Sequence, residues 1–311
     1  MNTRKEATET GRFPARSFML ALTTVVCMAG MSLAGTGIPA KAAEATESGS
    51  TAEASETAVS DSNAETSETA VSNSNTETSE TAESDSIAEA YTGWKKVDGV
   101  KYYYVDGEKV TGWKKISGKY YYFNAKGKLQ TNKIVGSKKK GYYYVDKTGV
   151  RVTDARIKAA VNFVVTHSKS SQSNRARLKA CYVAMYNNPY KRFYGDTPSA
   201  STMPSYAAYM FKYNTGNCYR YASAMAYIAR VLGYDSRVTT GGVNSSGGTY
   251  LAAHGWCEIK VGSTWRILDC SIQLKHKNVS LFLVTRKTYP YPLRWDKSYR
   301  MTVKNGKVTW K

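Results

Sequence analysis

One cysteine of the sequence stands where a nucleophile is favoured. In segment 215–234, alanines and aliphatic residues recur at helical spacing. Asn217 or Thr215 fits the N-cap, and Gly233 fits the left-handed residue after a helix end. Cys218 therefore lies in the first turn of a predicted helix. A thiol there meets the positive end of the helix dipole and free backbone N–H groups, which favour the thiolate and could hold an oxyanion.

A thiolate nucleophile needs a base, and the chain has three histidines. His167 and His276 stand among Ser and Lys residues, which is typical of the surface. His254 instead lies in an apolar segment, 252–261, that is predicted to be a strand. A Gly-Ser turn follows, and residues 264–269 are predicted to be the antiparallel partner strand. His254 is therefore the candidate base.

The predicted turn fixes which residues of the two strands face each other. A two-residue turn at 262 and 263 places Trp256 opposite Asp269, and Cys257 opposite Leu268. Because side chains alternate, His254 and Asp269 share one face, one diagonal step apart and within reach of a hydrogen bond. A slip of one residue would turn Asp269 to the other face. We expect Asp269 to orient His254.

Taken together, these residues resemble the transglutaminase-like superfamily of papain-fold enzymes over about 154–290. A Gly-Asn-Cys run opens the helix at Cys218, a His-Gly-Trp run begins at His254, and Asp269 follows, at spacings of 36 and 15 residues. The resemblance implies acyl transfer through a thioester: Cys218 attacks an amide carbonyl, His254 relays protons and Asp269 orients it. An amine or water completes the turnover. Candidates for a second oxyanion donor or a supporting role are Asn217, Tyr213 and Trp256.

The cysteines leave other roles open. An exported protein with four mature cysteines could pair them in three ways. Cys257 and Cys270 fall together on the back of the predicted hairpin, near the geometric limit for a disulfide, which would leave Cys181 and Cys218. A zinc site is disfavoured, since only Cys257 lies near His254 and no close cysteine pair exists. We expect neither a metal nor a cofactor.

The remaining pattern predicts an α+β domain over 154–311. Helices are predicted at 154–165, capped by Thr153 or Asp154, and around 176–186. Segment 187–213 is predicted to form loops with a short helix. A strand at 281–284 and an Asn-Gly hairpin within 301–310 complete the sheet.

The N-terminus has the pattern of a secretory signal. Four bases precede an apolar run from Phe18 to Leu33, and a small-residue site follows at 40–42. The run is too short and interrupted for a membrane span, and no later stretch comes closer. We therefore expect a signal peptide at 1–43 and an exported chain without an integral membrane segment.

Charge divides the rest of the chain. Segment 44–90 holds 12 acids and no Lys or Arg, and its Ser, Thr and Glu composition predicts a disordered linker. Segment 91–311 holds 39 bases and 10 acids, which gives a charge of +29. Such a charge favours an anionic partner. Export argues against nucleic acid and for a wall polymer.

Between the linker and the domain lies a degenerate repeat, 91–153. A Gly-Trp-Lys-Lys run occurs at 93 and 112, and aromatic triplets occur at 102, 120 and 142. Each unit of about twenty residues is predicted to be a hairpin. Since a lone hairpin is barely stable in water, stacked neighbours must supply the core, and an all-β hairpin solenoid results.

The repeats resemble cell-wall-binding repeats of the choline-binding and glucan-binding type. In that family, aromatics of successive hairpins frame a cavity for a quaternary ammonium or a sugar face. The third unit departs from the pattern, with Asn132-Lys133 in place of Gly-Trp. The many lysines suit an anionic polymer, so the expected ligand is teichoic acid, choline or a glycan; alternatively, the aromatics are only core. The candidate ligand residues are Trp94, Tyr102, Tyr103, Trp113, Tyr120 and Tyr121.

The sequence thus predicts a secreted cysteine acyltransferase or peptidase that is held non-covalently at the cell wall and acts on protein or peptidoglycan-peptide amides. The domain of 154–311 carries 24 bases and 6 acids, which favours acidic substrates. Two alternatives stay open. The enzyme could hydrolyse rather than cross-link, or the chain could be an adhesin-like wall-binding protein with a silent site.

Overall fold

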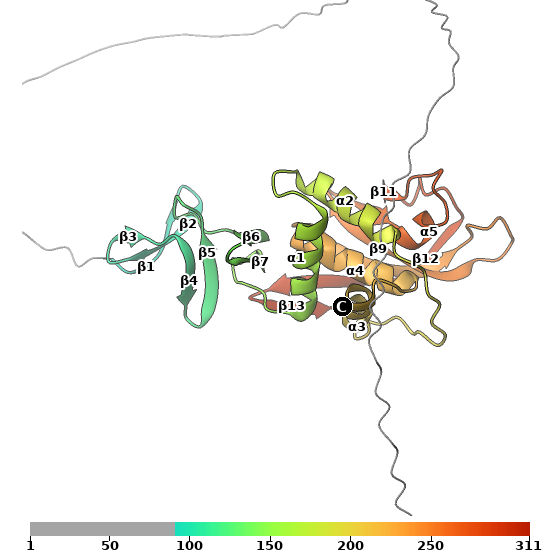
Figure 1. The fold of residues 1–311 in the computed structure, drawn as a ribbon, viewed down its shortest axis with the longest axis horizontal. Coiled ribbons are helices and arrows are strands. Elements are labelled where there is room, and N and C mark those ends of the chain that lie inside the picture. The colour runs from blue at the N-terminus through green and yellow to red at the C-terminus, as the bar shows by residue number, and fades with distance from the viewer. Residues whose placement is uncertain (1–90) are drawn as a thin grey trace, which may run out of the picture. The chain divides into compact units, whose positions relative to one another are not determined.

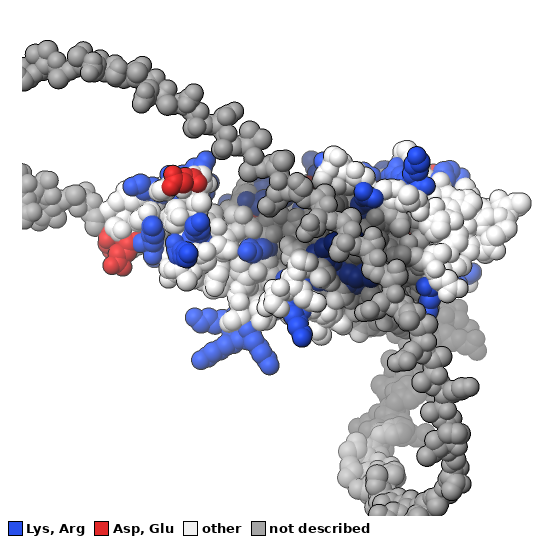
Figure 2. Space-filling view, turned by 90° about the horizontal axis from the view of Figure 1, so that it is seen from above, with Lys and Arg blue, Asp and Glu red and all other residues white. Residues whose placement is uncertain are grey.

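A computed structural model describes residues 91–311 (Figure 1). The predicted signal peptide and linker lie outside the described residues. On the face drawn in Figure 2, Lys and Arg side chains outnumber Asp and Glu, as the composition predicts. None of the described helices is long and apolar enough to span a membrane.

Three β-hairpins occupy the repeat region, as predicted. Each hairpin is antiparallel; the first two turn over two residues, and the third turns over three, Lys138 to Lys140. In the first two turns, Asp98-Gly99 and Ser117-Gly118 all have positive φ, the backbone that a tight hairpin turn requires. The strands are β1 (Gly93–Val97), β2 (Val100–Val105), β3 (Glu108–Lys109), β4 (Gly112–Ile116), β5 (Lys119–Phe123), β6 (Lys133–Ser137) and β7 (Gly141–Val145).

Short return segments join successive hairpins. The backbone N–H of Leu129 donates to the Lys101 carbonyl of the first hairpin (2.9 Å), and that of Arg151 donates to the Tyr120 carbonyl of the second (2.9 Å). The same backbone hydrogen bond therefore connects each hairpin to the next. Such contacts between neighbours produce the stacking expected of a solenoid.

The third hairpin also contacts the domain that follows it. Asn132 Nδ2 donates to the Gly233 carbonyl (2.9 Å), and Lys147 pairs with Asp235 (2.9 Å). Asp146 Oδ2 accepts from the backbone N–H of Gly306 (2.8 Å). These polar contacts tie the end of the repeat to both the helical and the sheet part of the domain.

The domain is a mixed α/β structure, which confirms the predicted fold class. Its six strands form one antiparallel sheet in the order β11-β10-β9-β8-β12-β13. Helix α4 packs against β8 and β9, and α1, α2 and α3 pack around α4 (Figure 1). The elements are α1 (Ala155–His167), α2 (Asn174–Tyr186), α3 (Met203–Tyr213), α4 (Cys218–Val231), β8 (Ser236–Val243), β9 (Ala252–Val261), β10 (Thr264–Leu268), α5 (Cys270–Gln273), β11 (Phe282–Val284), β12 (Leu293–Lys304) and β13 (Lys307–Trp310).

Local sequence signals explain most of these elements. Asp154 caps α1 by accepting the backbone N–H groups of Arg156 and Ile157, as predicted. The buried residues of α1 recur at helical spacing and face the core. Segment 187–213 differs from the prediction in the length of its helix, because α3 has 11 residues. Pro204 occupies the first turn of α3. A backbone N–H in the first turn has no acceptor within the helix, so the proline removes no helical hydrogen bond.

The β9–β10 hairpin has the predicted register. Cys257 pairs with Leu268, and Val261 pairs with Thr264 across the turn. Gly262 has φ +59° there, a backbone conformation that glycine adopts without strain. The register decides which side chains of the two strands reach the same face.

Candidate active site

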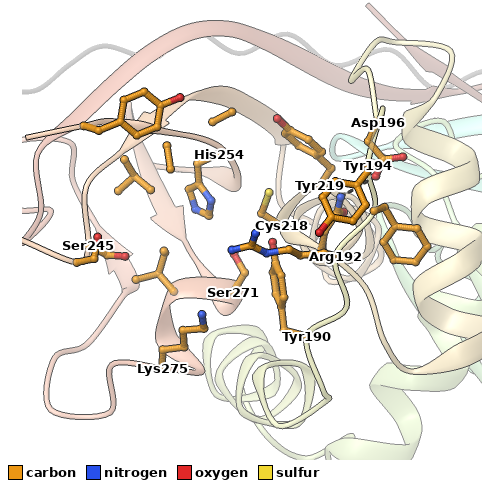
Figure 3. A pocket seen from close by; sticks show the side chains of 18 of the residues that line it. Tyr190, Arg192, Tyr194, Asp196, Cys218, Tyr219, Ser245, His254, Ser271 and Lys275 are labelled. Carbon is orange, nitrogen blue, oxygen red and sulfur yellow. Dashed lines mark hydrogen bonds between the residues drawn. The ribbon is translucent and has the colours of Figure 1, made fainter. Parts of the chain in front are cut away.

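Cys218 is the first residue of α4. The Asn217 side chain caps the helix by accepting the backbone N–H of Arg220 (3.3 Å), so the N-cap prediction is confirmed. Cys218 is 6% exposed, and it lies on the wall of a cavity of about 970 Å³ (Figure 3). A nearly buried thiol at a helix N-terminus, open on one side to a cavity, has the surroundings of a reactive cysteine.

His254 and Asp269 form a buried pair beside the cavity. The His254 imidazole lies on the wall that faces Cys218 (Figure 3), and its Nε2 donates to Asp269 Oδ2 at 2.8 Å. Asp269 lies one residue beyond β10 and caps α5 by accepting the backbone N–H of Ile272 (3.1 Å). The hairpin register and the cap together hold the carboxylate against the imidazole.

Both members of the pair are charged at neutral pH. Burial alone lowers the pKa of His254, but the Asp269 charge and hydrogen bond and the nearby Cys218 thiol outweigh it and raise the pKa to about 10. Burial raises the pKa of Asp269, but its hydrogen bonds and the His254 charge outweigh it, so that pKa is lowered. The site thus holds an imidazolium beside the Cys218 side chain.

A hydroxyl that sequence reasoning missed completes this pair. Tyr289 Oη donates to Asp269 Oδ2 (2.7 Å), the oxygen that also accepts from His254. Ser271 Oγ donates to the other oxygen (3.1 Å). Because Tyr289 follows the β11 strand, nothing in the local pattern around Asp269 could have indicated it.

Asn217 and Trp256, expected to hold an oxyanion or to support the site, both donate hydrogen bonds to carboxylates of the chain. The Trp256 indole N–H donates to Glu258 (3.0 Å), and the Asn217 amide donates to Asp196 (2.6 Å). Trp256 also stacks on the His254 ring, at 6.0 Å between centroids and 24° between planes. Tyr213 is half exposed and does not line the cavity. Trp256 thus packs on the His254 ring, and Asn217 caps the helix that begins at Cys218.

Glu258 is a second group that the sequence analysis missed. Its carboxylate is buried, accepts the Trp256 indole, and pairs with Arg237 (2.5 Å) and Arg286 (3.1 Å). Strand alternation places residues 254, 256 and 258 on one face of β9, so a lone acid two residues after Trp256 was the available signal. The carboxylate fixes the tryptophan that stacks on His254.

The cavity is positively charged. Arg192 and Lys275 line it (Figure 3), and neither forms an ion pair within residues 91–311. Asp196, the acid on the cavity wall, is already paired with Arg220. Tyr190 also lines the cavity, and burial and the nearby Cys218 raise its pKa to about 12. Two cations that lack an ionic partner in the described chain therefore line the cavity onto which Cys218 opens.

The other histidines and cysteines lie outside this arrangement. His167 is exposed, and His276 is half-buried against Tyr291. All four cysteines of the described chain are free thiols, so the Cys257–Cys270 disulfide does not form. Within the described residues, no three His, Cys, Asp or Glu side chains are grouped to hold a metal.

The aromatics of the hairpins gather in two clusters. In the first, Trp94 packs against Tyr103 (5.2 Å between centroids) and Tyr121 (5.1 Å). In the second, Trp113 packs against Tyr122 (5.1 Å) and Tyr143 (5.5 Å). Each cluster spans two successive hairpins, as the resemblance implies.

Two of the predicted ligand residues lie differently. Tyr102 is outside the first cluster and carries Lys109 over its ring (4.8 Å). Tyr120 lies at the second cluster, beneath Arg151 (4.6 Å). The sequence analysis missed Tyr122 and Tyr143. Tyr143 is the middle residue of its triplet, as Tyr121 is, and Tyr122 faces Trp113 across its hairpin as Tyr103 faces Trp94.

Two family models match parts of this chain. The family model of the transglutaminase-like superfamily matches residues 159–270, and that of the choline-binding repeat matches residues 110–155. No curated protein matches the chain.

Similar solved structures fall into two groups. A choline-binding domain from Streptococcus pneumoniae is 35% identical, with 21% of this chain and 98% of that chain covered and a TM-score of 0.19. A proposed cysteine protease from Cytophaga hutchinsonii is 20% identical (42% of each chain, TM-score 0.31). An arylamine N-acetyltransferase from Mycobacterium abscessus is 14% identical (50% of this chain, 55% of that chain, TM-score 0.28). The assignment rests on the family models: this chain carries a domain of the transglutaminase-like superfamily, preceded by a choline-binding repeat.

Proposed function

We propose that residues 154–311 form a cysteine acyltransferase or peptidase in which Cys218 is the nucleophile, His254 the proton relay and Asp269 the group that orients it. The observation that carries this proposal is the buried His254–Asp269 pair on the wall of the cavity that Cys218 opens into. A histidine that is fixed by a carboxylate and faces a thiol at a helix N-terminus is the arrangement that thioester chemistry needs.

The steps follow from the charges of the site. The Cys218 thiolate attacks the carbonyl carbon of an amide, and the free N–H groups at the start of α4 stabilise the oxyanion. The C–N bond then breaks as the His254 imidazolium gives its proton to the leaving amine, which leaves a thioester on Cys218. Water or a second amine attacks the thioester and gives its proton to His254. The thiolate leaves, and the imidazolium is restored.

The cavity favours a substrate that carries negative charge near the reacting amide. Arg192 and Lys275 lie on its wall without ionic partners in the described chain, so a carboxylate of an acidic protein or of a wall peptide would supply what they lack. Asp196 does not oppose such a group, because Arg220 neutralises it.

The hairpins are proposed to hold the secreted enzyme at the cell wall without a covalent bond. A cluster of three aromatic rings that spans two hairpins suits a quaternary ammonium or a sugar face. The surrounding lysines suit an anionic polymer such as a teichoic acid. The repeats would thus bring the cavity close to wall peptides.

The direct test is to trap the acyl-enzyme. The mature chain is mixed with an acidic peptide library of wall-type amides, quenched in acid and analysed by mass spectrometry. We expect an acyl adduct on Cys218 that is absent in Cys218→Ser. An added primary amine that appears in the product would identify transfer, and its absence would identify hydrolysis. A chain that forms no adduct and turns over no amide would support the adhesin-like alternative.

A further inference from the structure

The return segments of the hairpins place different residues at one equivalent position. The backbone N–H of Leu129 bonds to the first hairpin as that of Arg151 bonds to the second. The next residue repeats the match, since Gln130 bonds to the Tyr122 carbonyl (2.8 Å) and Val152 to that of Tyr144 (3.0 Å). Leu129 and Arg151 are therefore the same position of successive units.

Arg151 lies over the second aromatic cluster. Its guanidinium carbon is 4.6 Å from the ring centre of Tyr120, 4.9 Å from that of Tyr143 and 5.7 Å from that of Trp113. Within residues 91–311, no carboxylate pairs with Arg151 and no side-chain hydrogen bond holds its guanidinium. Three rings around one cation form the cage that recognises a quaternary ammonium, and here the cation belongs to the chain itself.

The first cluster repeats the arrangement of Trp113, Tyr122 and Tyr143 without a cation, and Lys101 holds the register position of Tyr120 there. Trp94, Tyr103 and Tyr121 pack together as Trp113, Tyr122 and Tyr143 do. In the described chain, no Lys or Arg lies over the three rings of the first cluster. Trp94 is 38% exposed, so this cluster is open to solvent.

We propose that Arg151 is a built-in ligand that fills the second cage and closes it to external cations. The hairpin region then has one open cage, at Trp94, Tyr103 and Tyr121. A tethered guanidinium competes at an effective concentration on the order of millimolar, and it also repels a second cation from the filled cage. That the open cage takes a quaternary ammonium rests on the proposed function; that the second cage is filled does not.

The equivalent position of the preceding unit suggests the variants for a test. Leucine occupies it there, so Arg151→Leu and Leu129→Arg exchange the residues of the two units. Choline chloride is titrated into the mature chain by isothermal calorimetry and equilibrium dialysis. We expect one site in the wild type, two sites in Arg151→Leu and none in Leu129→Arg. Lys147→Leu is the matched control: it removes one charge from the same unit outside the cage, and it should leave the number of sites at one.

Each outcome decides the proposal. Two sites in the wild type, or no added site in a folded Arg151→Leu, would overturn it. No site in the wild type with one in Arg151→Leu would support the filled cage and contradict the proposed ligand of the first cage.

A measurement on the unaltered protein decides the case where Arg151→Leu fails to fold. NMR of the wild type should show the Arg151 side-chain protons shifted upfield by the ring currents of the three aromatics. Resonances at the positions of an exposed arginine would contradict the proposal, whatever the variants do.

Discussion

The candidate active site and the hairpin cages each hold a cationic side chain, but different groups stabilise the two cations. In the domain, the buried His254 cation is held by the Asp269 carboxylate, which Tyr289 fixes in turn. In the hairpins, the half-exposed Arg151 is held by rings and by no carboxylate of the described chain. Removing one partner of a buried ion pair lowers the free energy of unfolding by about 3–5 kcal/mol. A cation over an aromatic ring contributes only about 0.5–2 kcal/mol.

The two regions also differ in how far apart their parts lie in sequence. The site joins the start of α4, the β9–β10 hairpin and the segment after β11, so it requires the whole domain. A cage joins residues of adjacent units only. Variants in the site should therefore abolish function, and variants in a cage should weaken it by degrees.

The largest effect is expected from the nucleophile. Cys218→Ala removes the atom that attacks, and a loss on the order of 10⁴-fold or more in acyl transfer should follow. Turnover of the amide that labels Cys218 measures it. Cys181→Ala makes the same chemical change at a buried thiol away from the cavity and should keep activity. Equal loss in both variants would show that Cys218 acts through the fold.

Breaking the pair should come next. Asp269→Asn leaves the His254 cation without its carboxylate, so we expect a loss on the order of 10⁴-fold in turnover. The free energy of unfolding should fall by about 3–5 kcal/mol, as for a broken buried pair. Chemical denaturation gives the second quantity. Asp296→Asn is the control, because it breaks the exposed pair with Arg294. It should leave turnover unchanged and lower the free energy of unfolding by about 1 kcal/mol or less.

The pair also sets a pH dependence. The pKa of His254 is raised from 6.5 to about 10, so its share of stability is complete below pH 6.5 and is lost as pH rises through 10. The pKa of Asp269 is lowered from 3.8, so its share is complete above that value and is lost in more acidic solution. Turnover should fall near pH 10, when the imidazolium that protonates the leaving amine disappears. In Asp269→Asn this limb should move toward pH 6.5, and an unmoved limb would contradict the pairing.

The cations of the cavity should have a smaller effect. Iodoacetate and iodoacetamide alkylate the same thiol, but only the first carries a charge. Arg192→Gln and Lys275→Gln should each lower the ratio of the two rates about fivefold, the size of ~1 kcal/mol for a partly exposed charge pair. Lys212→Gln, on α3 away from the cavity, should leave the ratio unchanged. An unchanged ratio in the two cavity variants would remove the argument for an acidic substrate.

The smallest effect belongs to the open cage. Trp94→Ala should weaken wall binding by roughly threefold to thirtyfold, the range of one cation–π contact, and leave turnover of a soluble amide unchanged. Binding to isolated walls measures it. Tyr102→Ala removes an aromatic of the same hairpin outside the cage, and an equal loss there would argue against the cage as the binding site.

The parts of this protein that could be predicted are those with short-range rules. The two-residue turn and strand alternation placed Asp269 beside His254, and the Asn217 cap placed Cys218 at the start of α4. The register of a tight hairpin leaves few alternatives, and a cap is a contact between near neighbours in sequence.

What the sequence could not indicate depends on contacts between distant segments. Tyr289 donates to Asp269 from 20 residues further along the chain. Glu258, which accepts the Trp256 indole N–H, also pairs with Arg237 and Arg286. Arg151 is a different case. Its equivalence to Leu129 is visible in the repeat, but its position over three rings depends on how the hairpins stack.

The central claim is that Cys218 is a nucleophile paired with His254, and the pH dependence of its alkylation tests this most directly. Iodoacetamide labelling of the mature chain is followed by mass spectrometry across the pH range, in the wild type and in His254→Ala. An ordinary thiol reacts only as pH approaches ~8.5. We predict fast labelling of wild-type Cys218 well below that pH, and loss of this labelling in His254→Ala. Wild-type labelling that follows the ordinary thiol curve would contradict it.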